Sequence, residues 1–120
     1  MTPEQEDAAI IQDLVAIFPE VKEQVVGDLD LVYEVAGAFA LCLRDLIRAG
    51  ADSGDERVRR AFALLDDLAR RESVNAQEIA AFGVMEVVMD FPETDPVARS
   101  LLGERGTELW ESVRRFWHGA

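Results

Sequence analysis

The stretch LVYEVAGAFALCLRDLIRAG, residues 31–50, decides the fold. Its apolar side chains recur every three or four residues, which is the spacing of one face of an α-helix. The resulting stripe comprises Leu31, Val35, Phe39, Leu43 and either Leu46 or Ile47. Asp28 or Asp30 is expected to cap the start of this helix, and Gly50 is expected to end it. The pattern predicts a core helix.

Two more helices are predicted directly downstream. A cap signature at residues 53–56 precedes a helix whose inward face is expected to hold Val58, Ala61, Phe62, Leu65 and Leu68. Its outward face is expected to hold Arg57, Arg60, Asp66, Asp67 and Arg71. Residues 75–78 are expected to cap the next helix, 79–90, which is apolar nearly all round and is therefore predicted at the centre of the domain. Gly83 would allow a close helix crossing there.

Both ends of the chain are also predicted to be helical. Thr2-Pro3-Glu4-Gln5 combines a cap with a proline at the first helical position, and this helix is expected to stop near Ile17, ahead of Pro19. A short helix, 19–26, closed by Gly27, should come next. Near the C-terminus, prolines break the chain before a short helix, 96–102, and Gly103 and Gly106 interrupt the chain beyond that helix. The last helix carries Leu109, Trp110, Val113, Phe116 and Trp117.

No alternating run of β-branched residues bounded by turn residues occurs, so the sequence predicts an all-α fold of about six to seven helices. A chain of 120 residues with 49% apolar residues is long enough for one core, and a single helical domain over 1–120 is expected. Short links between helices fit either a helical bundle or stacked helical pairs.

Charge is the feature that bears most directly on partners. The net charge is −12, and the first 34 residues hold nine acidic side chains against one base, Lys22. Such a field repels nucleic acid and anionic membranes and attracts a basic protein. The contact residues predicted for that partner are Glu20, Glu23, Asp28 and Asp30. Alternatively, the same charges are explained by the preference of helix starts for acidic side chains and by the solubility that negative charge provides.

Candidate catalytic residues are few. Glu86 and Asp90 lie four residues apart on one predicted helix, so their carboxylates share a face and are a candidate metal or arginine site. The alternative is that both pair with arginines or reach solvent. His118 is the only histidine and lies at the chain end, and phosphate-loop, zinc and di-iron motifs are absent. We therefore expect no cofactor, no bound metal and no enzymatic activity.

Cys42, the only cysteine, lies in an apolar setting and excludes an internal disulfide. The acidic start of the chain differs from a secretory signal, and the longest apolar runs are too short to cross a bilayer. A cytoplasmic location is expected.

Residues 75–86, from Asn75-Ala76-Gln77-Glu78 to Met85-Glu86, and residues 101–117 resemble small helical bacterial proteins, some associated with toxin immunity. The resemblance covers about the C-terminal third of the chain. It implies binding, because an immunity protein blocks its toxin by occupying the surface that contacts the toxin's substrate. Three hypotheses result: an acidic protein-binding module of immunity type, a structural or regulatory homo-oligomer that uses the 110–117 face, and a carboxylate metal enzyme that uses Glu86 and Asp90.

Overall fold

Helices account for all the regular secondary structure in residues 1–25 and 31–118, the part of the chain that this computed structural model describes. The elements are α1 (Pro3–Ile17), α2 (Val21–Gln24), α3 (Val32–Arg48), α4 (Glu56–Arg70), α5 (Val74–Glu78), the π-helix η1 (Ile79–Met85), α6 (Glu86–Val88), α7 (Thr94–Leu101) and α8 (Glu104–His118). Because α5, η1 and α6 follow one another without a break, these residues form seven helical segments. The all-α prediction is confirmed.

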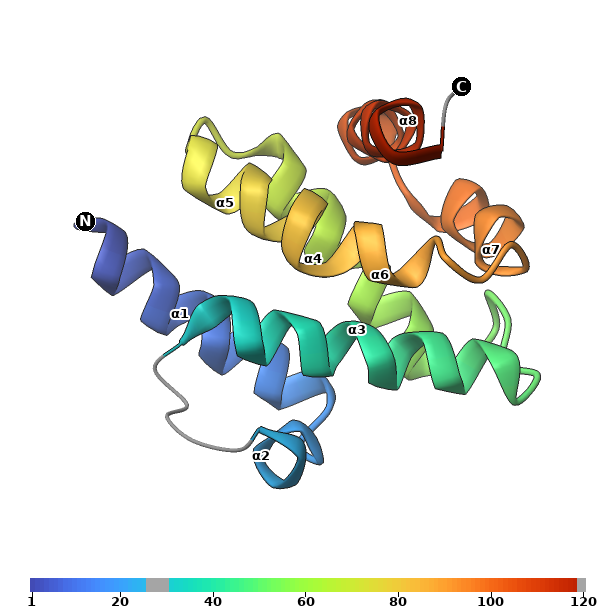
Figure 1. The fold of residues 1–120 in the computed structure, drawn as a ribbon, viewed down its shortest axis with the longest axis horizontal. Coiled ribbons are helices and arrows are strands. Elements are labelled where there is room, and N and C mark those ends of the chain that lie inside the picture. The colour runs from blue at the N-terminus through green and yellow to red at the C-terminus, as the bar shows by residue number, and fades with distance from the viewer. Residues whose placement is uncertain (26–30, 119–120) are drawn as a thin grey trace.

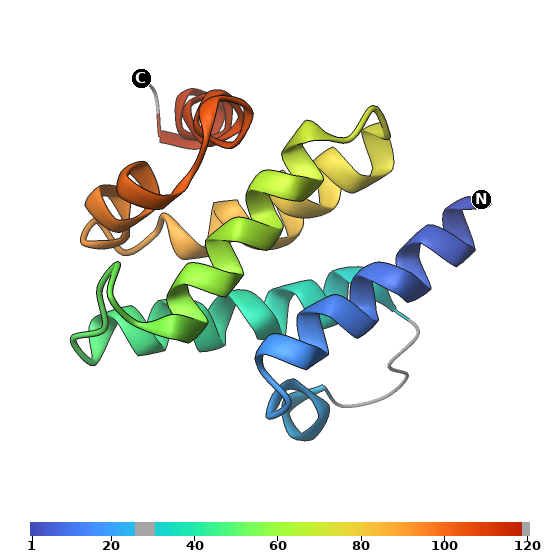
Figure 2. The same ribbon diagram turned by 180° about the vertical axis from the view of Figure 1, so that it is seen from behind.

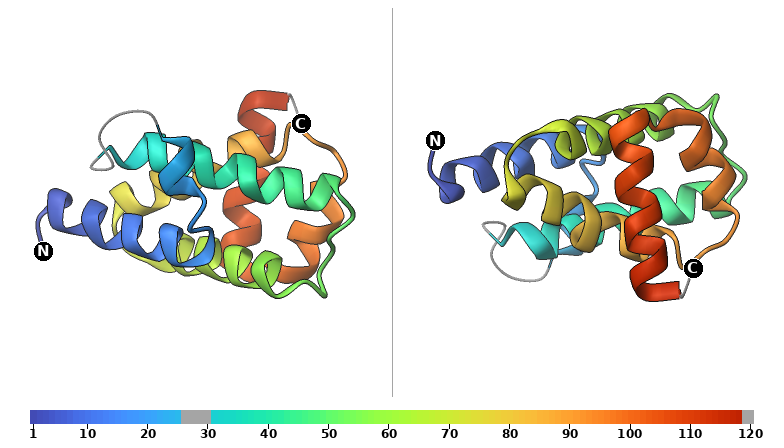
Figure 3. Two further views of the ribbon diagram at one scale, coloured as in Figure 1. Left: turned by 90° about the horizontal axis from the view of Figure 1, so that it is seen from below. Right: turned by 90° about the horizontal axis from the view of Figure 1, so that it is seen from above.

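The helices cross one another at wide angles. In Figure 1, α3 lies across the view with α1 beside it, while α8 is seen nearly end-on. Figure 2 shows α4 running diagonally over the opposite side of α3, and the right-hand view of Figure 3 shows α8 running crosswise to α4, which it contacts. The continuous α5–η1–α6 segment contacts α3 on one side and α4 and α8 on the other. This central place agrees with its predicted position.

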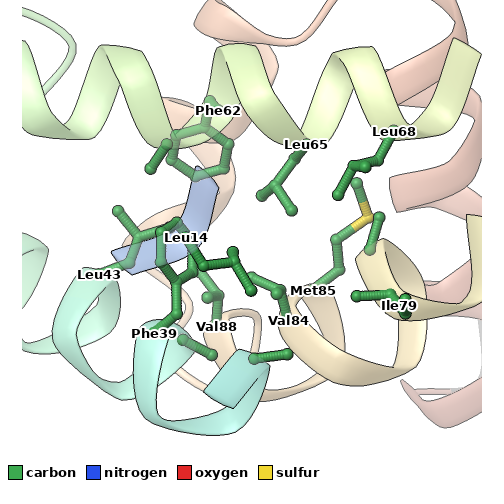
Figure 4. Close-up of a cluster of buried hydrophobic side chains, with 14 of the residues drawn as sticks. Leu14, Phe39, Leu43, Phe62, Leu65, Leu68, Ile79, Val84, Met85 and Val88 are labelled. Atoms are coloured by element: carbon green, nitrogen blue, oxygen red, sulfur yellow. The ribbon is translucent and has the colours of Figure 1, made fainter. Parts of the chain in front are cut away.

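The hydrophobic core joins helices that are distant in the sequence. Figure 4 shows Leu14 from α1 and Phe39 from α3 meeting Phe62 from α4 and Met85 from η1. All four side chains are fully or almost fully buried. Burial of each large apolar side chain contributes about 1.5–3 kcal/mol, so this shared cluster is the main source of stability.

Local sequence signals place several helix ends correctly. Thr2 and Gln5 form the predicted capping box, and α1 ends at Ile17. Asp55 caps α4, and every residue predicted to face inward on α4 is buried. Gly50 has a positive φ of 109° and ends the turn after α3, as expected. The predicted caps of α3, Asp28 and Asp30, lie outside the described residues, and Leu31 is half-exposed instead of belonging to the core stripe.

Several predicted boundaries are wrong. The short helix predicted at 96–102 is α7, Thr94–Leu101, so Pro96 lies in its first turn instead of being its first residue. The second helix spans only Val21–Gln24, because Val25 takes the extended backbone that a β-branched residue favours. The central segment begins at Val74 rather than at residue 79, and its cap is Ser73, whose hydroxyl accepts from the Ala76 N–H at 3.1 Å. Asn75 does not cap it, because its side-chain amide donates to carboxylates on α1.

Gly83 makes the close crossing that the sequence predicted. A Cβ added at this glycine would lie 2.9 Å from the Cβ of Ala36 on α3. A Cβ atom is fixed to its backbone, so neither helix can relieve such a contact without moving. The absence of a side chain at Gly83 thus sets how closely η1 approaches α3.

Asp66 is the clearest departure from the predicted surface of α4. It was expected to face outward, yet its carboxylate accepts from the Gly103 N–H at 2.8 Å and from the Gly106 N–H at 3.1 Å. These amides open α8, so a side chain from α4 caps a helix about 40 positions away. Gly106 is therefore part of α8, and the predicted interruption there is wrong. An added Cβ at Gly106 would lie 2.5 Å from the Asp66 carboxylate.

Candidate functional site

A surface groove lies where α2, α3 and α6 meet, and we name it the acidic groove. Its volume is about 520 Å³, and its lining consists of Gln24, Val25, Tyr33, Glu34, Gly37, Ala38, Leu41 and Val87. Tyr33 and Leu41 are exposed even though they are large and apolar. The groove therefore offers an apolar floor that residues 1–25 and 31–118 leave uncovered.

The groove also carries negative charge. Glu34 belongs to the lining itself, and Glu23 is exposed on α2 beside the lining residue Gln24. Burial raises the pKa of the Tyr33 hydroxyl, and the charges of Glu78 and Asp7 raise it further. Burial also raises the pKa of the Cys42 thiol, to which the Gln24 amide donates at 3.4 Å. The groove thus combines an apolar floor with carboxylates from α2 and α3.

The four predicted contact residues differ in what surrounds them. Glu23 is exposed on α2, beside the groove residue Gln24. Glu20 lies in the turn before α2 and accepts from Arg57 of α4 at 3.0 Å, with both side chains over 40% exposed. Its charge is therefore partly neutralised. Asp28 and Asp30 lie outside the described residues.

The carboxylates nearest the N-terminus serve the fold. Glu6 accepts from the Ser73 hydroxyl at 2.6 Å and from the Asn75 amide at 3.0 Å, and these hydrogen bonds lower the pKa of Glu6. Asp7 accepts from the same amide at 2.8 Å. These contacts attach α1 to the start of α5, so part of the acidic excess that the sequence shows has a structural role.

The predicted carboxylate pair does not form part of a larger ligand cluster. Glu86 is half-buried at the start of α6, and Asp90 is exposed in the turn beyond it. Within residues 1–25 and 31–118, no group of three or more histidine, cysteine, aspartate or glutamate side chains is placed to hold a metal ion. The geometry of these residues gives a metal-dependent reaction no specific support.

Asp90 lines a small polar cleft of about 190 Å³ together with Met89, Pro92, Asp95 and Arg114. Asp95 accepts from Arg114 at 2.6 Å, from Arg99 at 2.7 Å and from the indole N–H of Trp110 at 2.9 Å. Burial alone would raise the pKa of Asp95, but these hydrogen bonds and the two arginine charges hold it below its ordinary value of 3.8. The arrangement joins α7 to α8, and we assign it a structural role.

A second apolar groove lies between η1 and α8, and we name it the aromatic groove. Its volume is about 350 Å³, and its lining consists of Val74, Gln77, Glu78, Ala81, Phe82, Leu109, Ser112, Val113 and Phe116. Phe82 packs edge-on against Phe116, which packs in turn against Trp117. Phe116 is 69% exposed and Trp117 is 50% exposed, whereas Trp110 is completely buried. Trp110 thus belongs to the core and cannot form part of a contact face.

Sequence reasoning missed the groove residues Tyr33, Leu41 and Val87. A signal was present, because Tyr33 and Leu41 are apolar residues of the 31–50 stretch that fall off its core stripe. An apolar residue on the polar side of a helix indicates a second contact surface. The neighbouring helices that turn those residues into a groove could not be identified from spacing alone.

These features define a small all-α domain with an acidic and an aromatic surface groove. A family model described as a domain of unknown function, DUF7674, matches residues 11–118. The chain belongs to that family. Comparisons with curated proteins and with solved structures give no match. No helix in residues 1–25 and 31–118 has the length and apolar content needed to traverse a membrane.

Proposed function

We propose that this domain binds a basic protein partner and that the acidic groove is the binding site. The observation that carries the proposal is the combination of an exposed apolar floor, at Tyr33 and Leu41, with the carboxylates of Glu34 in the lining and Glu23 beside it. Apolar contact supplies affinity, while the surrounding charge raises the association rate and selects a partner of opposite sign.

The partner surface that fits this groove is an amphipathic helix. Such a helix places apolar side chains at positions i, i+3, i+4 and i+7 into a groove and keeps its charged side chains at the rim. Lysines or arginines flanking the apolar face would meet Glu34 and Glu23 at the rim. Glu20 contributes less, because Arg57 already binds its carboxylate at 3.0 Å.

Charge reversal at the rim tests the site. A synthetic helical peptide with leucines at the groove spacing and lysines elsewhere serves as the probe, and the same peptide with glutamates in place of lysines is its control. We expect the double variant Glu23→Lys, Glu34→Lys to slow association of the lysine peptide about tenfold at low salt, because the local attraction is lost. Stopped-flow fluorescence over a range of salt concentrations measures this rate and should show a flatter salt dependence for the variant.

A matched variant distinguishes the effect of charges at the acidic groove from the effect of the net charge of the whole chain. Glu72→Lys combined with Glu93→Lys changes two exposed carboxylates away from the groove and gives the same net charge, −8 in place of −12. We expect this variant to bind the peptide at close to the wild-type rate. Equal slowing in both double variants would contradict the acidic groove as the site.

Inhibition of a basic toxin is a specific form of this binding, and the resemblance of residues 75–86 and 101–117 to immunity-type proteins is what supports it. An acidic inhibitor suits a nuclease, whose own substrate is a polyanion. If the gene beside this one encodes a toxin, adding the domain to that purified toxin should abolish its activity, and undiminished activity would reject this role.

A further inference from the structure

We propose that the aromatic groove is the interface of a symmetric homodimer in which α8 packs against α8 of a second copy. This surface is separate from the acidic groove, so the two proposals can fail independently. The starting observation is the concentration of exposed apolar side chains on one face. Val74 is 65% exposed, and with Phe82, Phe116 and Trp117 it makes up half of the large apolar residues exposed in the described part of the chain.

The distribution of charge on α8 indicates that the molecule bound at the aromatic groove is a second copy of this chain. The chain carries −12, so two copies repel each other when most of their surfaces meet. The helix α8 is an exception, because it carries three acidic and three basic side chains: Glu104, Glu108, Glu111, Arg105, Arg114 and Arg115. The groove lining adds one carboxylate from outside α8, Glu78, so a basic partner would gain little there, whereas two copies of α8 can approach without net repulsion between the helices.

The pattern of side chains along α8 matches a two-fold antiparallel pair. Successive residues turn by about 100° around a helix. Seen from Ser112, Glu108 and Arg115 therefore lie on one flank, and Leu109 and Phe116 lie on the other. Ser112 itself is small and exposed, and its hydroxyl donates to the Glu108 carbonyl at 3.0 Å, so it permits close approach without leaving a polar group unsatisfied.

A two-fold axis perpendicular to α8 at Ser112 makes each flank meet the same flank of the second copy in the reverse direction. Arg115 of one copy then lies beside Glu108 of the other, and Phe116 lies beside Leu109. Both charged groups are accessible, since Arg115 is exposed and the Glu108 carboxylate pairs with Arg105 at 3.4 Å, with both of those side chains over half exposed. Each of these two pairs occurs twice because of the symmetry. The interface therefore has a pair of opposite charges beside each apolar contact.

Sedimentation equilibrium of the full chain tests this proposal. We expect the wild-type mass to approach twice 13.3 kDa in the micromolar range. Phe116→Glu should raise the dimer dissociation constant at least about thirtyfold, because a central aromatic anchor is lost in both copies. Leu41→Glu, in the acidic groove, is the control and should leave the constant unchanged. A wild-type chain that remains monomeric up to millimolar concentration would overturn the proposal.

Charge exchange tests the register. Glu108→Arg and Arg115→Glu should each raise the dissociation constant about tenfold, because each places like charges together twice in the dimer. The double variant Glu108→Arg, Arg115→Glu restores opposite charges across the interface and should recover near wild-type affinity. Glu72→Arg makes the same charge change elsewhere and is the control. A double variant that dimerises more weakly than either single variant would overturn the antiparallel arrangement.

Discussion

Replacing Gly83 with alanine should lower the free energy of unfolding by about 2–3 kcal/mol, because the new methyl group would overpack the crossing of η1 and α3. The Cβ would lie 2.9 Å from the Cβ of Ala36, and the ring of Tyr33 is 3.6 Å away on the same side. Relief requires the two most closely packed helical segments to separate. Urea denaturation followed by circular dichroism measures the change.

Gly37→Ala on α3 is the matched control for this prediction. A Cβ at Gly37 would have no atom within 4 Å, so only the intrinsic helix preference of alanine acts there. We expect a gain in unfolding free energy of up to about 1 kcal/mol. The two substitutions are chemically identical and should have opposite signs. Stabilisation by both would show that the α3–η1 crossing has more room than the structure indicates.

Asp95→Ala should be the second strongly destabilising change, at about 3 kcal/mol. It removes the acceptor of the Trp110 indole N–H, and an unsatisfied donor on a fully buried side chain costs about 1–3 kcal/mol by itself. It also removes the carboxylate that pairs with Arg99 of α7 and with Arg114 of α8 and so joins these two helices. Asp45→Ala is the control: Asp45 is 66% exposed and lies 3.8 Å from the less exposed Arg44, and the effect should stay below about 1 kcal/mol.

The ionisation of the Asp95 carboxylate also leads to a prediction of how the stability of the fold depends on pH. The pKa of Asp95 lies below its ordinary value of 3.8 in the folded chain, so the folded state favours the ionised form. This contribution is fully present above the unfolded value and is lost as pH falls through the folded value. Wild-type stability should therefore fall below about pH 4 more steeply than that of Asp95→Ala. If the wild type and Asp95→Ala lost stability equally as the pH fell, the result would contradict the role assigned to the Asp95 carboxylate.

Much of the fold could be predicted because its signals are local. The capping box at Thr2, the cap at Asp55 and the stop at Gly50 are each defined by a few consecutive residues. The inward face of α4 follows from spacing alone. Two of the predictions that were wrong concern residues used by a distant segment: Asn75 bonds to α1, and Asp66 caps α8, which the sequence around either residue does not reveal.

The candidate site divides in the same way. The acidic excess of the first 34 residues is a property of composition, and the structure places Glu23, one of the predicted contact residues, exposed on α2. Which of these acidic side chains remain available for a partner required the structure, which shows Glu20 engaged by Arg57 and Glu34 in the lining of the acidic groove. Conversely, Trp110 and Phe116 look equivalent in the sequence, yet one is buried and the other is exposed.

The sequence by itself determined that this protein is helical, where several of its helices begin or end, and that its N-terminal third is strongly acidic. Those properties depend on hydrogen bonds, turns and charges within a few residues of one another. Only the tertiary structure decided which apolar side chains remain uncovered and which carboxylates already have partners. These two properties depend on contacts between helices that are far apart in the chain. The packing geometry of the helices determines those contacts, and the spacing of residues along the sequence does not specify them.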